Sequence, residues 1–251
     1  MNEKIFSITR ACAFTDQIFL KFLEEAKKNS FKTELDIAKF INSQIEFLGL
    51  KKSFPTIVAT GKNAVDWHHK PTKTIIKKGF CVIDFGIKVN GYCSDMTRTI
   101  YFGKANNKEK KIYAKVLKAN LETIKMVKEA TDGNLIYKHA KKVLGKLSKY
   151  FGHGLGHGLS KKIHDKPRLS KKPGEILKNG DIITIEPGVY IPKKFGIRIE
   201  DDVLVLENSQ IVLTLSEKKL IEIPLTNHNL KTGNTTNFKH NQKNHNCDKK
   251  N

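Results

Sequence analysis

The order of the predicted elements repeats along the chain, and this repeat constrains the fold more than any other feature of the sequence. Helix-like periodicity followed by strand-like runs first occupies residues 5–28, 33–49, 56–60 and 80–102. The second round occupies residues 110–130, 134–150, 182–191 and 197–206. Two related halves, each covering its strands with two helices, predict a duplicated α+β domain with a cleft where the two sheets meet.

Composition limits the classes of protein that remain. A length of 251 residues allows a sizeable core in one large domain or two small ones. No apolar stretch reaches the ~18 residues of a membrane span, and the N-terminal residues carry charges where a signal peptide would be apolar. The 4 cysteines form no C-x-x-C pair, which argues against a disulfide framework or a thiolate zinc site. We therefore expect a cytoplasmic protein with no membrane anchor.

The formal net charge of +21 raises the question of a nucleic-acid partner. The lysines are spread along the whole chain, and no basic stripe with interleaved aromatic residues stands out. We therefore interpret the charge as a composition bias and expect no nucleic-acid binding. Residues 226–251 are rich in Asn, Lys and His and have few large apolar side chains. We expect them to form a disordered tail after a folded domain of residues 1–225.

The segment VIDFGIKVNGYCSD places two aspartates in an otherwise apolar strand pattern. Its dipeptide Asn90-Gly91 is typical of a two-residue hairpin turn, in which both residues adopt positive φ. With that turn, Asp84 faces Thr97, and Asp95 is the diagonal neighbour of Asp84 on the same face, roughly 7–8 Å away. A buried carboxylate is costly unless it is paired or binds a metal. The two aspartates therefore predict a positive partner between them.

Further ligands for such a partner occur in the second half. The glycine-rich segment FGHGLGHGLSKKIH holds His153, His157 and His164, and its glycines favour a turn over a helix. Two later strand patterns each carry a glutamate within an apolar run, Glu186 and Glu200. Four carboxylates with histidine and without thiolate favour Mn²⁺ or a similar divalent metal. They are too many for a single ion and predict a pair about 3.5–4 Å apart.

These motifs resemble the pita-bread metallopeptidases, which include methionine aminopeptidases, aminopeptidase P and prolidase. The resemblance covers residues 1–215 and rests on FPTIVATGKNAVDWHHKPT, IDFGIKVNGYCSDMTRT, HGLGHGLSKKIHDKPRL, TIEPGVYIP and GIRIEDDVLV. Three pieces, GYCSDMTRT, EPGVYIP and GIRIEDD, are similar to the Xaa-Pro branch of the family. The resemblance implies the pita-bread fold, an α+β architecture in which antiparallel sheets of two halves form a central cleft.

The same resemblance implies roles for individual residues. The metal ligands would be Asp84, Asp95, His157, Glu186 and Glu200, holding two divalent ions, Mn²⁺ first, with Co²⁺, Zn²⁺ or Fe²⁺ as alternatives. The catalytic side chains would be His68, His164 and Glu186: Glu186 moves a proton, His164 stabilises the oxyanion and His68 reaches the scissile nitrogen. The substrate would lie against His68, His153, Tyr190 and Arg198, with Arg198 also pairing with the metal-binding carboxylates.

The implied activity is hydrolysis of the bond between an N-terminal residue and a following proline in a peptide. A methionine aminopeptidase, an Xaa-Pro dipeptidase and a non-catalytic peptide-binding module remain as alternatives, and a homodimer is one of the open oligomeric states. Two departures from the family pattern concern the cleft. Ser160 stands where the family usually has Gly, and Lys161-Lys162 replaces an acidic or apolar pair.

A third departure concerns the length of the substrate. Xaa-Pro enzymes usually carry an N-terminal non-catalytic domain, whereas the catalytic pattern begins here almost at Met1. Because that domain helps to wall off the cleft, we expect an aminopeptidase that accepts tripeptides and longer chains with proline second. The lysines of segment 159–180 could instead favour the C-terminal carboxylate of a dipeptide, which keeps a prolidase as the alternative.

Overall fold

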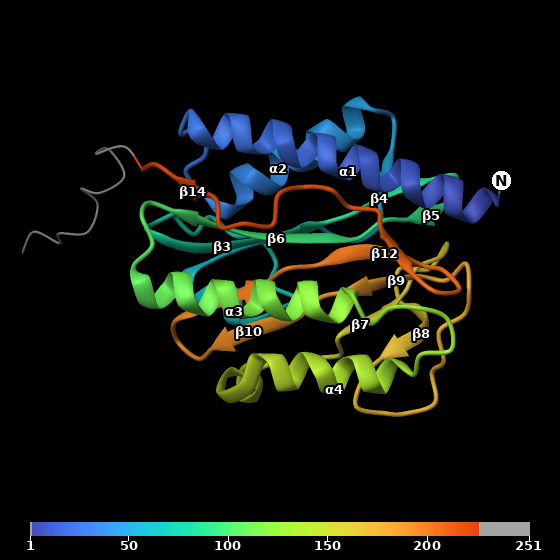
Figure 1. Ribbon diagram of the computed structural model, residues 1–251. Coiled ribbons are helices and arrows are strands. Elements are labelled where there is room, and N and C mark those ends of the chain that lie inside the picture. Colours follow the sequence, from blue (N-terminus) through green and yellow to red (C-terminus); the bar gives the residue numbers. More distant parts are fainter. Residues whose placement is uncertain (1, 226–251) are drawn as a thin grey trace, which may run out of the picture.

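The computed structural model describes residues 2–225, whose strands lie between two pairs of helices (Figure 1). The helices are α1 (Glu3–Lys27), α2 (Glu34–Phe47), α3 (Asn107–Ile124) and α4 (Gly133–Leu144). Figure 1 shows α1 and α2 on one side of the strands and α3 and α4 on the other. This arrangement confirms the two predicted halves. The tail expected over residues 226–251 lies outside the described residues.

Local sequence signals explain where the helices begin and end. α2 starts after the N-cap Thr33 with a capping box to Asp36, as its sequence spacing indicates. α3 starts with a second capping box. α4 ends before Gly145, which has a φ of 58°, a conformation that favours glycine. The chain then continues as the 3-10 turn η2 (Gly145–Tyr150), so the helix is shorter than its periodicity predicts.

The strands of the first half are β1 (Lys51–Lys52), β2 (Ile57–Thr60), β3 (Gly79–Phe85), β4 (Ile87–Val89), β5 (Tyr92–Cys93) and β6 (Met96–Phe102), with the 3-10 turn η1 (Gly61–Val65) after β2. β2, β3 and β6 are antiparallel neighbours in a four-stranded sheet, and β14 (Glu222–Ile223) runs parallel to β6 at its edge. β1, β4 and β5 form a separate three-stranded sheet. Phe19 and Phe22 of α1 and Ile41 of α2 share one buried core with Ile83 of β3.

The strands of the second half are β7 (Gly156–Gly158), β8 (Asp165–Leu169), β9 (Ile182–Ile185), β10 (Gly188–Ile191), β11 (Phe195–Arg198), β12 (Asp201–Val205) and β13 (Gln210–Val212). Five of them form an antiparallel sheet in the order β13-β12-β9-β7-β8, and β10 pairs only with β11. Val116 of α3 and Ile136 of α4 share a second core with Ile183 of β9 and Val203 of β12. Each pair of helices therefore covers the strands of its own half.

The register predicted for the first hairpin is confirmed. Asp84 is paired with Thr97 between β3 and β6, and Val89 is paired with Tyr92 across the turn. Asn90 and Gly91 both have positive φ, 51° and 82°. The hairpin is nevertheless divided between two sheets, because β3 and β6 belong to one and β4 and β5 to the other.

The two long strands predicted in the second half are also divided. Residues 182–191 form β9 and β10, with a break at Glu186, and residues 197–206 form β11 and β12, with a break at Glu200. Pro187 explains the first break, since it has no N–H to donate to a ladder. At the second break the N–H of Glu200 donates to the carbonyl of Thr97 in the other half, at 3.1 Å. Both glutamates therefore lie where the chain passes from one sheet to another.

Two further observations bear on the compartment and the thiols. None of the helices in the described part of the chain is long and apolar enough to cross a membrane. The three cysteines within that part, Cys12, Cys81 and Cys93, are buried free thiols.

Candidate metal centre

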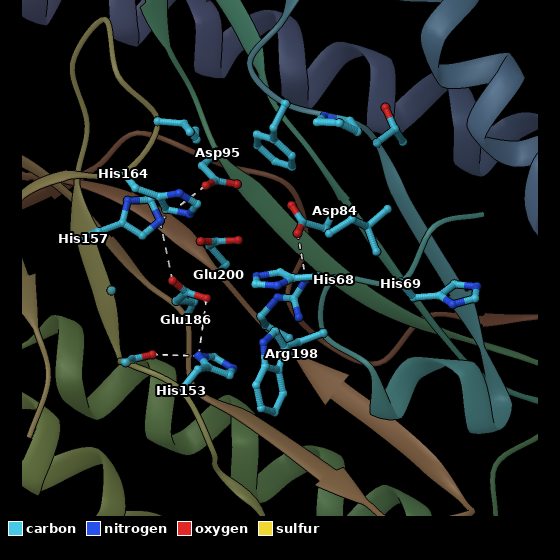
Figure 2. A pocket seen from close by; sticks show the side chains of 18 of the residues that line it. His68, His69, Asp84, Asp95, His153, His157, His164, Glu186, Arg198 and Glu200 are labelled. Carbon is cyan, nitrogen blue, oxygen red and sulfur yellow. Dashed lines mark hydrogen bonds and ion pairs between the residues drawn. The ribbon is translucent and has the colours of Figure 1, made fainter.

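A cavity of about 440 Å³ lies where the two halves meet, and it contains the residues that the motifs single out (Figure 2). All five expected metal ligands line it: Asp84, Asp95, His157, Glu186 and Glu200. So do four further expected site residues: His68, His153, His164 and Arg198. Positions that are distant in the sequence are thus brought together in space.

Three of the expected ligands form the tightest group. Asp95, His157 and Glu200 each offer a ligand atom within 4.8 Å of the other two. His157 Nε2 lies 3.6 Å from Asp95 Oδ2 and 3.7 Å from Glu186 Oε1. These separations are longer than hydrogen bonds and leave room for an ion between the side chains.

The backbone fixes which nitrogen of His157 faces this group. His157 Nδ1 lies 3.2 Å from the carbonyl oxygen of Gly158, which can only accept, so Nδ1 carries the proton. Nε2 then presents its lone pair to the carboxylates. Burial, and next the adjacent His164 ring, lower the pKa of His157 to about 4. The ring is therefore neutral near pH 7, which is the form that binds a metal.

The carboxylates carry more negative charge than the described side chains around them neutralise. Burial, followed by repulsion from neighbouring carboxylates, raises the pKa of Asp95 and Glu200 well above the usual range. Burial also raises the pKa of Asp84, and that of Glu186 to about 7. Asp84 Oδ1 and Asp95 Oδ1 are buried and have no hydrogen-bond partner. Such oxygens, in a set with one histidine and no thiolate, fit hard divalent cations.

Arg198 places a positive charge of the protein directly beside the carboxylates. Its Nη2 donates to Asp84 Oδ2 at 2.7 Å, and its Nε donates to Thr97 Oγ1 at 2.9 Å. Thr97 Oγ1 in turn donates to Glu200 Oε2 at 2.6 Å. One guanidinium thus orients two of the expected ligands, one directly and one through a hydroxyl. The sequence analysis placed Thr97 opposite Asp84 without giving it a role, and that register was the available signal.

Tyr190, which was expected to line the substrate pocket, lies behind the cavity wall and contacts residues that line it. It is 5% exposed and is absent from the described residues that line the cavity. Its hydroxyl accepts from Arg198 Nη1 at 2.9 Å and lies 2.8 Å from His153 Nε2. His153 Nδ1 lies 2.7 Å from the carbonyl of Gly154, so Nδ1 carries the proton and the tyrosine hydroxyl donates to Nε2. Burial is the main cause of the lowered pKa of His153, about 3.

Trp67 also lines the cavity, although no role was predicted for it from the sequence. Its ring lies in the cavity wall, with its centroid 5.6 Å from that of His153 and 5.5 Å from that of Tyr190. Both available signals were in the sequence: Trp67 is the single tryptophan of the chain, and it directly precedes His68. These rings form an aromatic wall beside the carboxylates.

Glycines beside His157 allow the close approach of strands that positions this side chain. A Cβ on Gly156 would collide with the carbonyl of Thr184 in β9, and one on Gly158 would collide with that of Lys166 in β8. His157 N also donates to Thr184 Oγ1 at 3.1 Å. The glycine-rich segment, predicted to form a turn, contains the short strand β7, and its glycines let the neighbouring backbone approach closely.

Gly156→Ala should therefore destabilise the protein. We expect a loss of about 1–3 kcal/mol in the free energy of unfolding, because β7 must move away from β9. Urea unfolding monitored by circular dichroism measures this loss. Gly154→Ala is the matched control, since its Cβ would meet its nearest atom at 3.3 Å, and its effect should be smaller. Equal stability of Gly156→Ala and the unaltered protein would contradict the packing argument.

The duplicated fold and a cleft with carboxylates, a neutral histidine and a paired arginine together define the pita-bread metallopeptidases. The sequence profile of metallopeptidase family M24 matches residues 7–207, and the chain belongs to this family. Its predicted fold and family are thereby confirmed. The family implies divalent metal ions and peptide substrates.

Named relatives support this membership in sequence and in structure. A Mycoplasma genitalium protein, provisionally named as an Xaa-Pro aminopeptidase, is 41% identical over 222 residues, 86% of this chain and 62% of its own. The Xaa-Pro dipeptidase of Pyrococcus furiosus is 36% identical over 88% of this chain and 64% of its own. The crystal structure of X-Pro aminopeptidase from Thermotoga maritima superposes with a TM-score of 0.83 at 29% identity, over 89% of this chain and 64% of that one. This chain thus spans less than two thirds of each relative.

Proposed function

We propose that this protein is a dinuclear metal-dependent Xaa-Pro aminopeptidase. The observation that carries the proposal is the convergence of four carboxylates, three of them buried and Glu186 partly buried, on the neutral His157, with Asp84 Oδ1 and Asp95 Oδ1 lacking a hydrogen-bond partner. Uncompensated buried charge is retained where it binds something positive. The names of the relatives support the choice of an Xaa-Pro bond as the substrate.

The ions would be held by the residues whose oxygens and nitrogen face one another in the cavity. We assign this role to Asp84, Asp95, His157, Glu186 and Glu200. When bound, two divalent ions lower the pKa of a water molecule and polarise a peptide carbonyl. The oxygen-rich set favours Mn²⁺ among the candidates, with Co²⁺, Zn²⁺ and Fe²⁺ as alternatives.

The remaining polar side chains would then move protons and hold the peptide. Glu186 lies between His157 and His153. Its Oε1 is 3.7 Å from His157 Nε2, and its Oε2 is 3.7 Å from His153 Nδ1. From there it takes a proton from the attacking water and returns it to the leaving nitrogen. His68 and His164 also line the cavity and would donate to the scissile nitrogen and to the oxyanion.

Recognition of the proline falls to shape, because the scissile nitrogen of an Xaa-Pro bond carries no hydrogen. Trp67 and His153 line the cavity with two aromatic rings whose planes are inclined at 59° to each other. Tyr190 supports these rings from behind through its contacts with both. A pyrrolidine ring packed there would place the preceding carbonyl toward the carboxylates.

An Xaa-Pro dipeptidase is the second candidate, and the cations of the cavity favour it. Lys70 and Arg168 line the cavity and could bind a C-terminal carboxylate close to the scissile bond. Lys161 and Lys162, which the sequence analysis considered for this role, are absent from the described lining residues, and Lys161 Nζ lies over the ring of Tyr92, 5.0 Å from its centroid. It stays a prediction that the protein accepts peptides longer than dipeptides, and a comparison of substrates of different length tests it.

Activity should disappear on chelation and return with Mn²⁺ or Co²⁺, because the carboxylate set requires cations. The assay compares Ala-Pro, Ala-Pro-Ala-Ala and Met-Ala as substrates after each metal is added. Cleavage of both proline peptides supports the aminopeptidase, and cleavage of Ala-Pro alone supports the dipeptidase. Cleavage of Met-Ala alone would support a methionine aminopeptidase. A protein that binds two equivalents of Mn²⁺ and cleaves none of these peptides would contradict the proposal.

A further inference from the structure

The segment between β2 and β3 is a connection with little regular structure that contributes five residues to the cavity lining: Trp67, His68, His69, Lys70 and Pro71. It spans residues 61–78, and η1 is the single helical turn within it. Trp67 and His68 lie near its middle and line the cavity. Figure 2 shows His68 beside Asp84 and Arg198, whereas His69 lies farther from the carboxylates. Something outside the segment must hold these side chains in place.

Glu34, the first residue of α2, contacts both ends of this segment with one buried carboxylate. The residue is 0% exposed. At the beginning of the segment, Oε1 accepts from the N–H of Thr60 at 2.8 Å, from its hydroxyl at 3.0 Å and from Asn63 Nδ2 at 2.9 Å. At the other end, Oε2 accepts from the N–H of Thr72 at 3.2 Å and from its hydroxyl at 2.9 Å, and lies 2.8 Å from His69 Nε2.

The charge state and the backbone strengthen this contact. Burial pushes the pKa of Glu34 upward, but the hydrogen bonds from Thr60, His69, Asn63 and Thr72 outweigh it and leave the pKa below its usual value. Both oxygens therefore act as acceptors at neutral pH. The first N–H groups of α2 add two bonds, from Glu34 to the carbonyl of Thr74 at 3.2 Å and from Leu35 to that of Thr72 at 3.0 Å.

These contacts hold the chain on both sides of Trp67 and His68. Thr60 and Asn63 lie before Trp67 and His68, and His69 and Thr72 follow them. With both ends tied to one carboxylate, the intervening residues keep a fixed path over the cavity. An exposed acid in the first turn of a helix needs no such partners, because the helix dipole already favours its charge.

We propose that Glu34 is a positioning residue that sets Trp67 and His68 against the carboxylate cluster. It touches neither substrate nor metal ligand and acts through the segment that it holds. The effect on catalysis rests on the proposed function, whereas the effect on the position of Trp67 does not.

Glu34→Gln tests the proposal, because an amide offers a single acceptor oxygen. Whichever way the amide turns, its NH₂ group faces donors at one end of the segment. We expect the emission of Trp67 to shift to longer wavelength and its quenching by acrylamide to increase. As Trp67 is the single tryptophan, the signal reports on this segment alone. The content of bound Mn²⁺ should stay unchanged, while kcat/KM should fall on the order of 100-fold, as for a displaced positioning group.

Asp36→Asn is the matched control. Asp36 lies in the same helix turn and closes its capping box with Thr33, but it accepts from the N–H groups of Lys32 and Thr33, which lie outside the segment. It should lower the stability of α2 without changing Trp67 emission or the kinetic constants. If Asp36→Asn reproduces the changes in emission and in kcat/KM, or if Glu34→Gln leaves the emission unchanged, the role of Glu34 is structural and the proposal is wrong.

Thr72→Val provides a second variant if Glu34→Gln does not fold. It removes the hydroxyl that donates to Glu34 Oε2 at little cost in volume, so Trp67 emission should shift in the same direction by a smaller amount. Unchanged emission in this variant would overturn the proposal. A complete absence of peptide cleavage by the unaltered protein would refute the proposed function instead, and the fluorescence of these variants would still decide the role of Glu34.

Discussion

Replacing Asp95 by Asn should lower turnover of an Xaa-Pro peptide by more than about 100-fold. This exceeds the loss expected for a residue that only hydrogen-bonds to a metal ligand. The substitution removes the negative charge and puts an NH₂ group in place of one oxygen, either the one that faces His157 or the one that is buried without a partner. It changes the volume little, so the fold should persist. The measurements are kcat/KM and the content of bound Mn²⁺ after dialysis. Full activity of Asp95→Asn would contradict the assignment of Asp95 as a metal ligand.

In the presence of a chelator, the same variant should lose no thermal stability. Asp95 lies among like charges that raise its pKa, so neutralising it should leave the melting temperature unchanged or raise it. Asp201→Asn is the control, because Asp201 is equally buried but paired with Arg98 at 2.8 Å and Lys218 at 2.9 Å. Leaving Arg98 without its partner should cost about 3–5 kcal/mol. A lower melting temperature of Asp95→Asn in chelator would mean that Asp95 is a structural group.

Arg198→Leu should have the second large effect, a loss of about 3–5 kcal/mol in the free energy of unfolding without metal. The guanidinium is the direct partner of Asp84 and, through Thr97, orients Glu200. Without it the carboxylates lose the positive charge that the chain supplies. Urea unfolding with and without Mn²⁺ measures the loss, and added Mn²⁺ should recover part of it.

Arg198→Lys separates charge from geometry. A lysine can pair with Asp84 but cannot also reach Thr97 and Tyr190, because its ammonium is a single point of donation. We expect most of the stability to return while kcat/KM stays low. Equal activity of Arg198→Lys and the unaltered protein would show that the hydrogen bonds from the guanidinium to Thr97 and Tyr190 have no role in activity.

The sequence predicted the site better than the course of the strands. The Asn90-Gly91 turn fixed the pairing of Asp84 with Thr97, because a two-residue turn leaves one register. The breaks at Glu186 and Glu200 were missed, since a strand buried on both faces reads as one apolar run whether or not it changes sheet. Only Pro187 signalled one of them.

The residues that orient the site were harder to predict than those that face it. Thr97 and Glu34 act through hydrogen bonds that join distant parts of the chain, and no local pattern marks such partners. Glu34 reads as an ordinary acid in the first turn of a helix. Its six side-chain contacts with Thr60, Asn63, His69 and Thr72 depend on how residues 60–72 return to α2, which is a property of the tertiary structure.

The proposed metal ligands come from both halves of the chain, so formation of the site depends on how the two halves fold and dock. With the ligand set proposed above, the first half contributes Asp84 and Asp95, and the second contributes His157, Glu186 and Glu200. A chain in which one half alone has folded holds at most three of the five groups. Under this assignment, the complete metal site forms only when both halves have docked, and a partly folded chain would hold an incomplete set of ligands.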